Sequence, residues 1–214
     1  PVEYQFKNKK SIVNQREIGN DASDLTVALK NALRQAPDCI LIGEIRDKET
    51  MSAALAYAQS GHLVVATLHA NNSYQALTRV INFYLIENRQ SLLADLSSSL
   101  RAIVSQRLVS AIDGKRRAAV EVMLNTRHIA ELIEQGEIAL IKEAIEKSLS
   151  PGSQTFEQAL MQLIKDGVVT QDEALAHADS ASNLFWLLNN SAQAVEEEAP
   201  EQEEASFTEF TLKM

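Results

Sequence analysis

The sequence predicts an α/β fold in which a mostly parallel β-sheet is flanked by helices. Two short apolar runs, at residues 39–42 and 62–69, have the length and aliphatic composition of buried strands. Stretches with helical periodicity precede, separate and follow them, and the links between them are short. Because strands that alternate with helices usually lie parallel and are covered on both faces, we expect helices on both sides of this sheet.

The N-terminal part contains two extended fragments and one helix. The fragments VEYQF and SIVNQREIG are strand-like. After the capping sequence NDASD, apolar residues recur with helical spacing from Leu25 to Ala36, which predicts an amphipathic helix. Pro37 is expected to end this helix, because proline disfavours helical geometry in the residue before it.

Capping residues mark the next two helices. Asp47 is placed to cap a helix whose inner stripe begins at Met51, and Gly61 lies where a helix end favours a left-handed residue. Asn72 or Ser73 is expected to cap the helix that follows the second strand.

Beyond residue 90 the pattern changes. A further amphipathic helix is predicted from Leu92 to Val104, followed by a hairpin around Asp113-Gly114. Residues 126–190 have helical patterns throughout, and the Glu-rich residues 191–214 are expected to be disordered. The predicted division of the chain is therefore a sheet-bearing part at residues 1–125, a helical subdomain at 126–190 and an acidic tail at 191–214.

Composition excludes several classes of function. The net charge is −9, and the acidic tail carries −6 of it, so the rest is close to neutral. No basic stretch interleaved with aromatic residues indicates nucleic-acid binding, and no apolar run approaches the roughly 18 residues that span a bilayer. The single cysteine, Cys39, lies in an apolar run and is interpreted as a buried structural thiol, which suits the cytoplasm.

Glu44 is the first candidate functional residue. It follows the apolar run 39–42, and a carboxylate beside a buried strand is costly unless it is paired or binds a cation. One interpretation is that Glu44 holds Mg²⁺ through water, or orients an attacking water. The other is an ion pair with Arg46 or with another arginine at the sheet edge. The residue pattern leaves both open.

Two histidines flank the second predicted strand. His62 and His69 are seven residues apart, so they do not share one face and one end of a strand, and joint metal binding is not expected. His69 lies with Asn71 and Asn72 at the carboxyl end, where ligands gather in parallel sheets. It is therefore the better candidate for contacting a phosphate, with a structural hydrogen-bonding role as the alternative for each histidine.

Several arginines lie near predicted strand ends or helix starts, where they could neutralise phosphates within the chain or across a subunit interface. These are Arg16, Arg34, Arg46 and Arg79. Solvated or ion-paired surface arginine is the ordinary alternative for each. The sequence contains no G-x-x-x-x-G-K-[ST] loop, so nothing in it is expected to cradle a triphosphate.

Ordered segments of the chain resemble the secretion and type IV pilus motor ATPases. The segments are PVEY, QREIG, ALKNALRQAPDCILIGEIRDKET, GHLVVATLHANN and ALTRVINF. PVEY resembles the end of the family's aspartate box, and ILIGEIRD resembles its atypical Walker B motif, with Glu44 in place of aspartate. GHLVVATLH resembles its histidine box. The chain lacks a four-cysteine module after that box, and ALAHADSASNL follows later, which favours the PilT/PilU-type retraction branch and the PilU type within it.

The resemblance implies part of a RecA-like P-loop ATPase core, followed by a helical C-terminal subdomain, and an activity that hydrolyses ATP with Mg²⁺. By position in the family motifs, Glu44 is implied to hold Mg²⁺ through water and to position the attacking water. Glu3 would belong to the acidic box near the catalytic water, and His69 would couple phosphate to ring conformation. His62 and Arg46 would have supporting roles.

The resemblance also implies a cytoplasmic homo-hexamer, peripheral at the inner membrane, that drives pilus retraction and twitching motility. Its partners would be a paralogous PilT-type retraction ATPase and an inner-membrane platform protein. Because no Walker A loop is present, we expect the chain to be the C-terminal portion of such an ATPase and to be inactive alone. The alternative is a non-catalytic regulatory or structural ring component that docks on an active partner motor.

Overall fold

The computed structural model describes residues 2–197, with side chains as far as residue 190, and they form two compact units with separate hydrophobic cores. The units are made of residues 2–107 with 120–155, and of residues 108–119 with 156–197. The division predicted at residues 125 and 190 stays a prediction. Within residues 2–197, no helix combines the length and the apolar character needed to cross a membrane.

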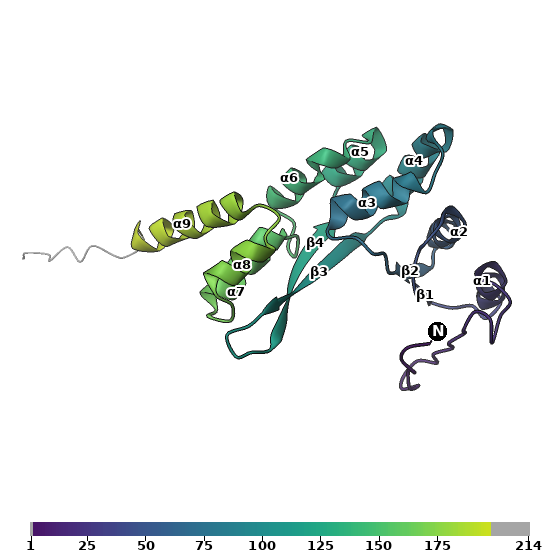
Figure 1. The fold of residues 1–214 in the computed structure, drawn as a ribbon. Coiled ribbons are helices and arrows are strands. Elements are labelled where there is room, and N and C mark those ends of the chain that lie inside the picture. Colours follow the sequence, from purple (N-terminus) through teal and green to yellow (C-terminus); the bar gives the residue numbers. More distant parts are fainter. Residues whose placement is uncertain (1, 198–214) are drawn as a thin grey trace, which may run out of the picture. The chain divides into compact units, whose positions relative to one another are not determined.

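The first unit combines a pair of parallel strands with helices (Figure 1). Its elements, in chain order, are α1 (Leu25–Leu33), β1 (Cys39–Ile42), α2 (Lys48–Gln59), β2 (Leu63–Ala66), α3 (Ser73–Asn82), the short 3-10 helix η1 (Ile86–Asn88), α4 (Arg89–Ser99), α5 (Arg127–Gln135), the 3-10 helix η2 (Ile138–Leu140) and α6 (Ile141–Glu146). The strands β1 and β2 are joined by α2, and Ile40 lies opposite Val64. The predicted α/β class is confirmed.

The strand pair is buried on one face and exposed on the other. Ile40 and Ile42 belong to the core of the first unit, whereas Leu41 is 59% exposed and Cys39 is also exposed. The expectation of a buried thiol was therefore wrong. Alternate residues of a strand point to opposite sides of the sheet. The burial pattern therefore shows that, among the described residues, the expected cover on both faces of the strand pair is found on one face only.

Two predicted helix caps are present. Asp47 accepts a hydrogen bond from the backbone N–H of Thr50 at the start of α2, and Asn72 accepts one from Gln75 at the start of α3. Their carboxylate and amide oxygens satisfy N–H groups that the first turn of a helix leaves without an internal partner. Both helices therefore begin directly after the loops that leave β1 and β2.

The first helix ends earlier than predicted. α1 stops at Leu33, and Ala36 adopts a left-handed conformation with φ of 46°. The chain has already left helical geometry through a tight turn, in which the N–H of Ala36 donates to the carbonyl of Leu33. Pro37 therefore follows the end of the helix by several residues and does not set it.

The strand-like fragments near the N-terminus are not strands in the described structure. Between residues 2 and 24 the recorded pairing is a single bridge of Ile18 with Ala22. Apolar side chains here are exposed, with Ile12 at 82%. A strand needs a neighbouring strand to satisfy its backbone groups, and the described residues supply none beside these fragments.

The predicted hairpin is formed by β3 (Ala102–Ser110) and β4 (Arg116–Leu124), with Gly114 in a left-handed turn position. The helix predicted to run to Val104 ends at Ser99 instead. Apolar residues at 100, 103 and 104 extend the helical pattern of α4 by coincidence, and pairing with β4 places the last two in a strand.

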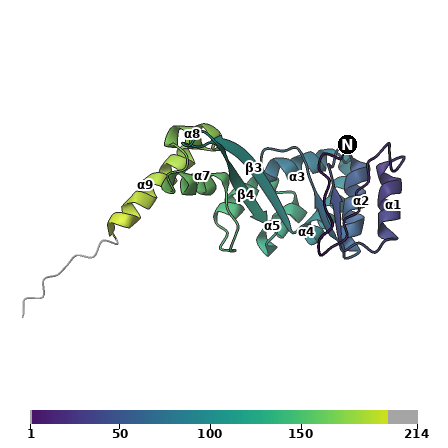
Figure 2. The ribbon, with the colours of Figure 1, turned by 90° about the horizontal axis from the view of Figure 1, so that it is seen from below.

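The second unit packs helices beside the tip half of the hairpin. Its helices are α7 (Phe156–Lys165), α8 (Gln171–His177) and α9 (Ala181–Glu197). Phe156, Leu160 and Leu184 are fully buried in its core with Val109 of β3, and α7 contacts both other helices (Figure 2). The predicted tail starts within α9, and residues 198–214 lie outside the described residues.

Candidate functional site

The carboxyl ends of β1 and β2 bring the two leading candidates together. Beyond the strands, the backbone N–H of Ile45 donates to the carbonyl of Thr67 at 2.9 Å, and the Thr67 hydroxyl donates to the carbonyl of Gly43. These bonds hold the two loops side by side after the regular ladder has ended. Glu44 and His69, one on each loop, therefore lie next to each other.

The two oxygens of the Glu44 carboxylate face two different side chains, the guanidinium of Arg46 and the imidazole of His69. Oε2 accepts a hydrogen bond of 2.5 Å from Nε of Arg46, and Oε1 lies 3.3 Å from Nε2 of His69. The Glu44 side chain is only 18% exposed, whereas those of Arg46 and His69 are 76% and 82% exposed. Exposed partners add little stability. The backbone holds Glu44 in place, and both partners have room to move away from it.

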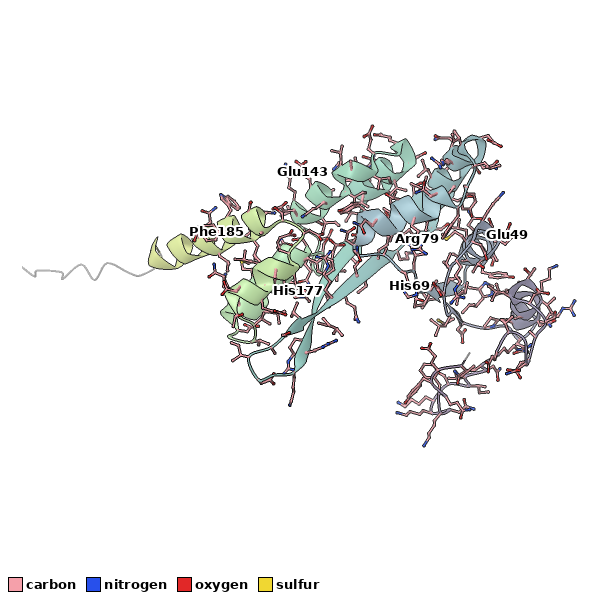
Figure 3. The ribbon with its side chains drawn as sticks, viewed as in Figure 1. Glu49, His69, Arg79, Glu143, His177 and Phe185 are labelled. Atoms are coloured by element: carbon pink, nitrogen blue, oxygen red, sulfur yellow. The ribbon has the colours of Figure 1, made fainter. Side chains whose placement is uncertain are left out.

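From α3, Arg79 supports the loop of residues 67–72 that carries His69 (the histidine loop). Its Nη1 donates to the carbonyl oxygen of His69 at 2.9 Å, and Figure 3 shows the two residues side by side. They border a surface hollow of about 450 Å³ lined by Leu68, His69, Ala70, Asn71, Gln75 and Arg79. Guanidinium, imidazole and amide groups among these lining residues suit an anionic oxygen ligand such as phosphate.

His62 lies away from this cluster. It precedes β2, and its Nδ1 is 3.0 Å from the hydroxyl of Ser60 and 3.3 Å from the carbonyl of Tyr57. Both partners belong to the end of α2. The structure therefore gives His62 a local hydrogen-bonding position at the end of β2 opposite to His69.

Glu3 and Arg16 are not brought to the cluster in the described structure. Both are exposed in the irregular N-terminal segment, and the recorded hydrogen bonds and ion pairs of Glu44 run to Arg46 and His69. Of the residues predicted for the site, the tertiary structure thus gathers Glu44, His69, Arg46 and Arg79.

Residues 1–127 match the family model described as type II/IV secretion system protein. The chain belongs to this family. The match confirms the resemblance drawn from the aspartate-box, Walker B and histidine-box segments, all of which lie within it.

Relatives within the secretion family include pilus motors. The chain is 52% identical over 189 residues to the type IV pilus ATPase PilU of Pseudomonas aeruginosa, covering 88% of this chain and 50% of PilU. It is 38% identical over 184 residues to the type IV pilus retraction ATPase PilT of the same organism, covering 86% and 54%. A crystal structure of the pilus retraction motor PilT with bound ADP superposes with a TM-score of 0.78 at 36% identity, covering 87% of this chain and 52% of that one. The chain spans about half the length of the curated relatives it matches.

The residues of this secretion-family chain fit a Mg²⁺–nucleotide only in part. Among the described residues, no group of three or more His, Cys, Asp or Glu side chains is arranged to hold a metal. Glu44 is a single carboxylate with histidine and arginine neighbours. Because Mg²⁺ keeps several waters and takes one or two carboxylates together with substrate phosphates, this donor set suits contact through water.

Sequence reasoning missed Glu121 and Arg107, which lie on the hairpin and contact the start of α3 and the end of the histidine loop, respectively. The side chain of Glu121 accepts hydrogen bonds from Ser73, and Arg107 donates to the carbonyl of Asn71. A signal existed for Glu121, because it shares one face of β4 with Ala119 and Met123, which are buried. An acid on the apolar face of an alternating strand requires a partner.

Proposed function

We propose that the chain carries the water- and Mg²⁺-handling part of an ATP-hydrolysing motor of the PilU type, which drives retraction of type IV pili. The observation that carries the proposal is the meeting of a largely buried Glu44 with an exposed His69 at the carboxyl ends of two parallel strands. Support for the motor class comes from the relatives, which are a pilus ATPase and a pilus retraction ATPase.

In this mechanism Glu44 accepts a hydrogen bond from the attacking water and orients it for in-line attack. A bound Mg²⁺ would neutralise charge on the phosphates. The Arg46 guanidinium pairs with the carboxylate and holds its orientation while no water occupies the site. His69 and Arg79, which both line the hollow, are placed to respond to a phosphate oxygen, so that its arrival or loss moves the histidine loop.

The proposal extends to assembly. By resemblance to the family, the motor would work in the cytoplasm as a homo-hexamer at the base of the pilus on the inner membrane. A paralogous PilT-type ATPase and an inner-membrane platform protein would be its partners. In that setting Arg16 and Glu3 would join the site from the N-terminal segment.

The test measures the rate of ATP hydrolysis by the whole natural protein and by its Glu44→Gln and Glu44→Ala variants. Loss of the water-orienting carboxylate is expected to lower kcat by about 10²–10⁴-fold while nucleotide binding persists. Glu49→Gln is the matched control, because Glu49 is an exposed glutamate in the first turn of α2 (Figure 3). Unchanged turnover in the Glu44 variants would contradict the proposal, whereas absence of turnover in the unsubstituted protein would favour the non-catalytic ring component.

A further inference from the structure

The loop that carries His69 is fastened to the β3–β4 hairpin as well as to β1. At its far end Nη2 of Arg107, on β3, donates to the carbonyl of Asn71 at 3.2 Å. One residue beyond Asn72, the backbone N–H of Ser73 donates to Oε1 of Glu121 at 2.7 Å, and the Ser73 hydroxyl donates to the same oxygen. All of these residues belong to the first unit.

Glu121 is the most unusual member of this set. It is 2% exposed, and its partner Ser73 at the start of α3 is as deeply buried at 0%, as is the capping residue Asn72 at 1%. Packing alone would favour an apolar side chain at this position of β4, because burying a carboxylate is costly. The cost of burying the Glu121 carboxylate is offset by its charge-assisted hydrogen bonds with Ser73 and by the positive end of the α3 dipole.

The start of α3 determines where His69 sits, for two reasons. His69 is four residues before Ser73 along the chain, so the loop between them is short. Arg79, on the same helix, also holds the carbonyl of His69. A displacement of the first turn of α3 therefore moves His69 through the backbone and through Arg79 together.

We infer that Glu121 is a positioning residue, which locks the start of α3 against β4 and thereby keeps His69 beside Glu44. Arg107 performs the same task at Asn71. The catalytic consequence rests on the proposed function, whereas the positioning of His69 is independent of it. Glu121 acts through Ser73 and does not touch the reacting groups.

The structural arm of the test uses the chain itself. The protein has four histidines, so isotope-labelled histidine gives a spectrum in which the His69 signal can be assigned with a His69→Gln variant. Glu121→Leu keeps the volume and removes the acceptor. It is expected to shift the His69 ring signal and to speed hydrogen exchange at residues 69–73 by roughly 10-fold or more, because the Ser73 amide loses its acceptor and the loop before it loses this anchor. Glu121→Gln keeps an acceptor oxygen and should restore most of both readouts.

Glu157→Gln is the matched control. Glu157 is another fully buried glutamate, and its Oε1 accepts from the backbone N–H of Ser180 at 2.8 Å, just before α9 in the second unit. Its substitution should leave the His69 signal unchanged. If Glu121→Leu does not fold, Glu121→Met and Arg107→Met decide the matter, because each removes one of the two side chains that fasten this segment. An unchanged His69 signal and unchanged exchange, in folded Glu121→Leu or in both substitutes, would overturn the inference.

The catalytic arm uses the whole natural protein. Glu121→Leu is expected to displace His69 and thereby to lower kcat by roughly 10-fold or more with little change in KM. The rate of the chemical step is sensitive to small displacements of the groups around the reacting atoms. An inactive Glu44→Gln beside a fully active Glu121→Leu would contradict the inference and leave the proposed function standing. An active Glu44→Gln would contradict the proposed function, and the His69 signal would then decide the positioning role alone.

Discussion

At the scale of single residues, Asp47 links the candidate site to the helix behind it. It lies three residues after Glu44 and accepts the hydrogen bond that begins α2. That backbone hydrogen bond from Thr50 is the main reason that the pKa of Asp47 is lowered from its ordinary value. The site loop is therefore short and ends on a rigid helix start, which helps to fix the direction of the Glu44 backbone.

We expect Asp47→Ala to lower the free energy of unfolding by about 1 kcal/mol at neutral pH, because a capping acceptor is lost. Since the pKa of Asp47 is lower in the folded than in the unfolded chain, its contribution is present above the unfolded pKa. The contribution is lost as the pH falls through the folded pKa. Urea unfolding of both proteins at neutral and acid pH measures this. A difference that widens in acid would contradict the assignment.

At the scale of elements, β1 shows how a continuous apolar run can be buried on one side only. Ile42 is 2% exposed and lies in the core, and its neighbour Leu41 is 59% exposed on the opposite face. The residue pattern of β1 does not distinguish these faces, because all of its residues are apolar. The difference comes from α-helical cover, which in the described residues reaches only the inner face.

Adjacent substitutions in β1 test this asymmetry. Ile42→Ala is expected to lower the free energy of unfolding by about 2–5 kcal/mol, through lost burial and a cavity. Leu41→Ala removes a similar side chain and should change it by about 0.5 kcal/mol or less, because that side chain already meets solvent. Urea midpoints of the two variants provide the comparison, and similar losses would show that the outer face is covered in solution.

At the scale of the whole molecule, the described chain has two cores, one in each unit. Ile133 of α5 is fully buried in the first, and Leu160 of α7 is fully buried in the second. The hairpin contributes residues to both, with Met123 in the first and Val109 in the second. The candidate site and the Glu121 contact both belong to the first unit.

Separate cores predict separate local stabilities. Leu160→Ala should lower hydrogen-exchange protection chiefly in residues 108–119 and 156–190, and Ile133→Ala should lower it chiefly in the first unit, since each leaves a cavity in its own core. Exchange measured by mass spectrometry reports both regions in one experiment. An equal loss of protection across both units from either variant would show that the chain unfolds as one cooperative body.

Much of the local structure was predictable from sequence. The caps at Asp47 and Asn72, the turn at Asp113-Gly114 and the strand ends that carry Glu44 and His69 all follow from short-range patterns. Errors arose where an element's state depends on distant partners. The N-terminal fragments do not form strands, because the described residues offer them no neighbouring strand. Residues 103 and 104 belong to β3 because they pair with β4.

The sequence by itself determined the family, the alternation of helices and strands, and the acid at the end of the first strand. These depend on motifs, periodicity and caps, which act within a few residues. Only the tertiary structure decided that Arg46 and His69 share the Glu44 carboxylate, that Cys39 is exposed and that Glu121 holds the start of α3. Each of these depends on burial or hydrogen bonding between side chains and segments that chain folding brings together, which local patterns do not specify.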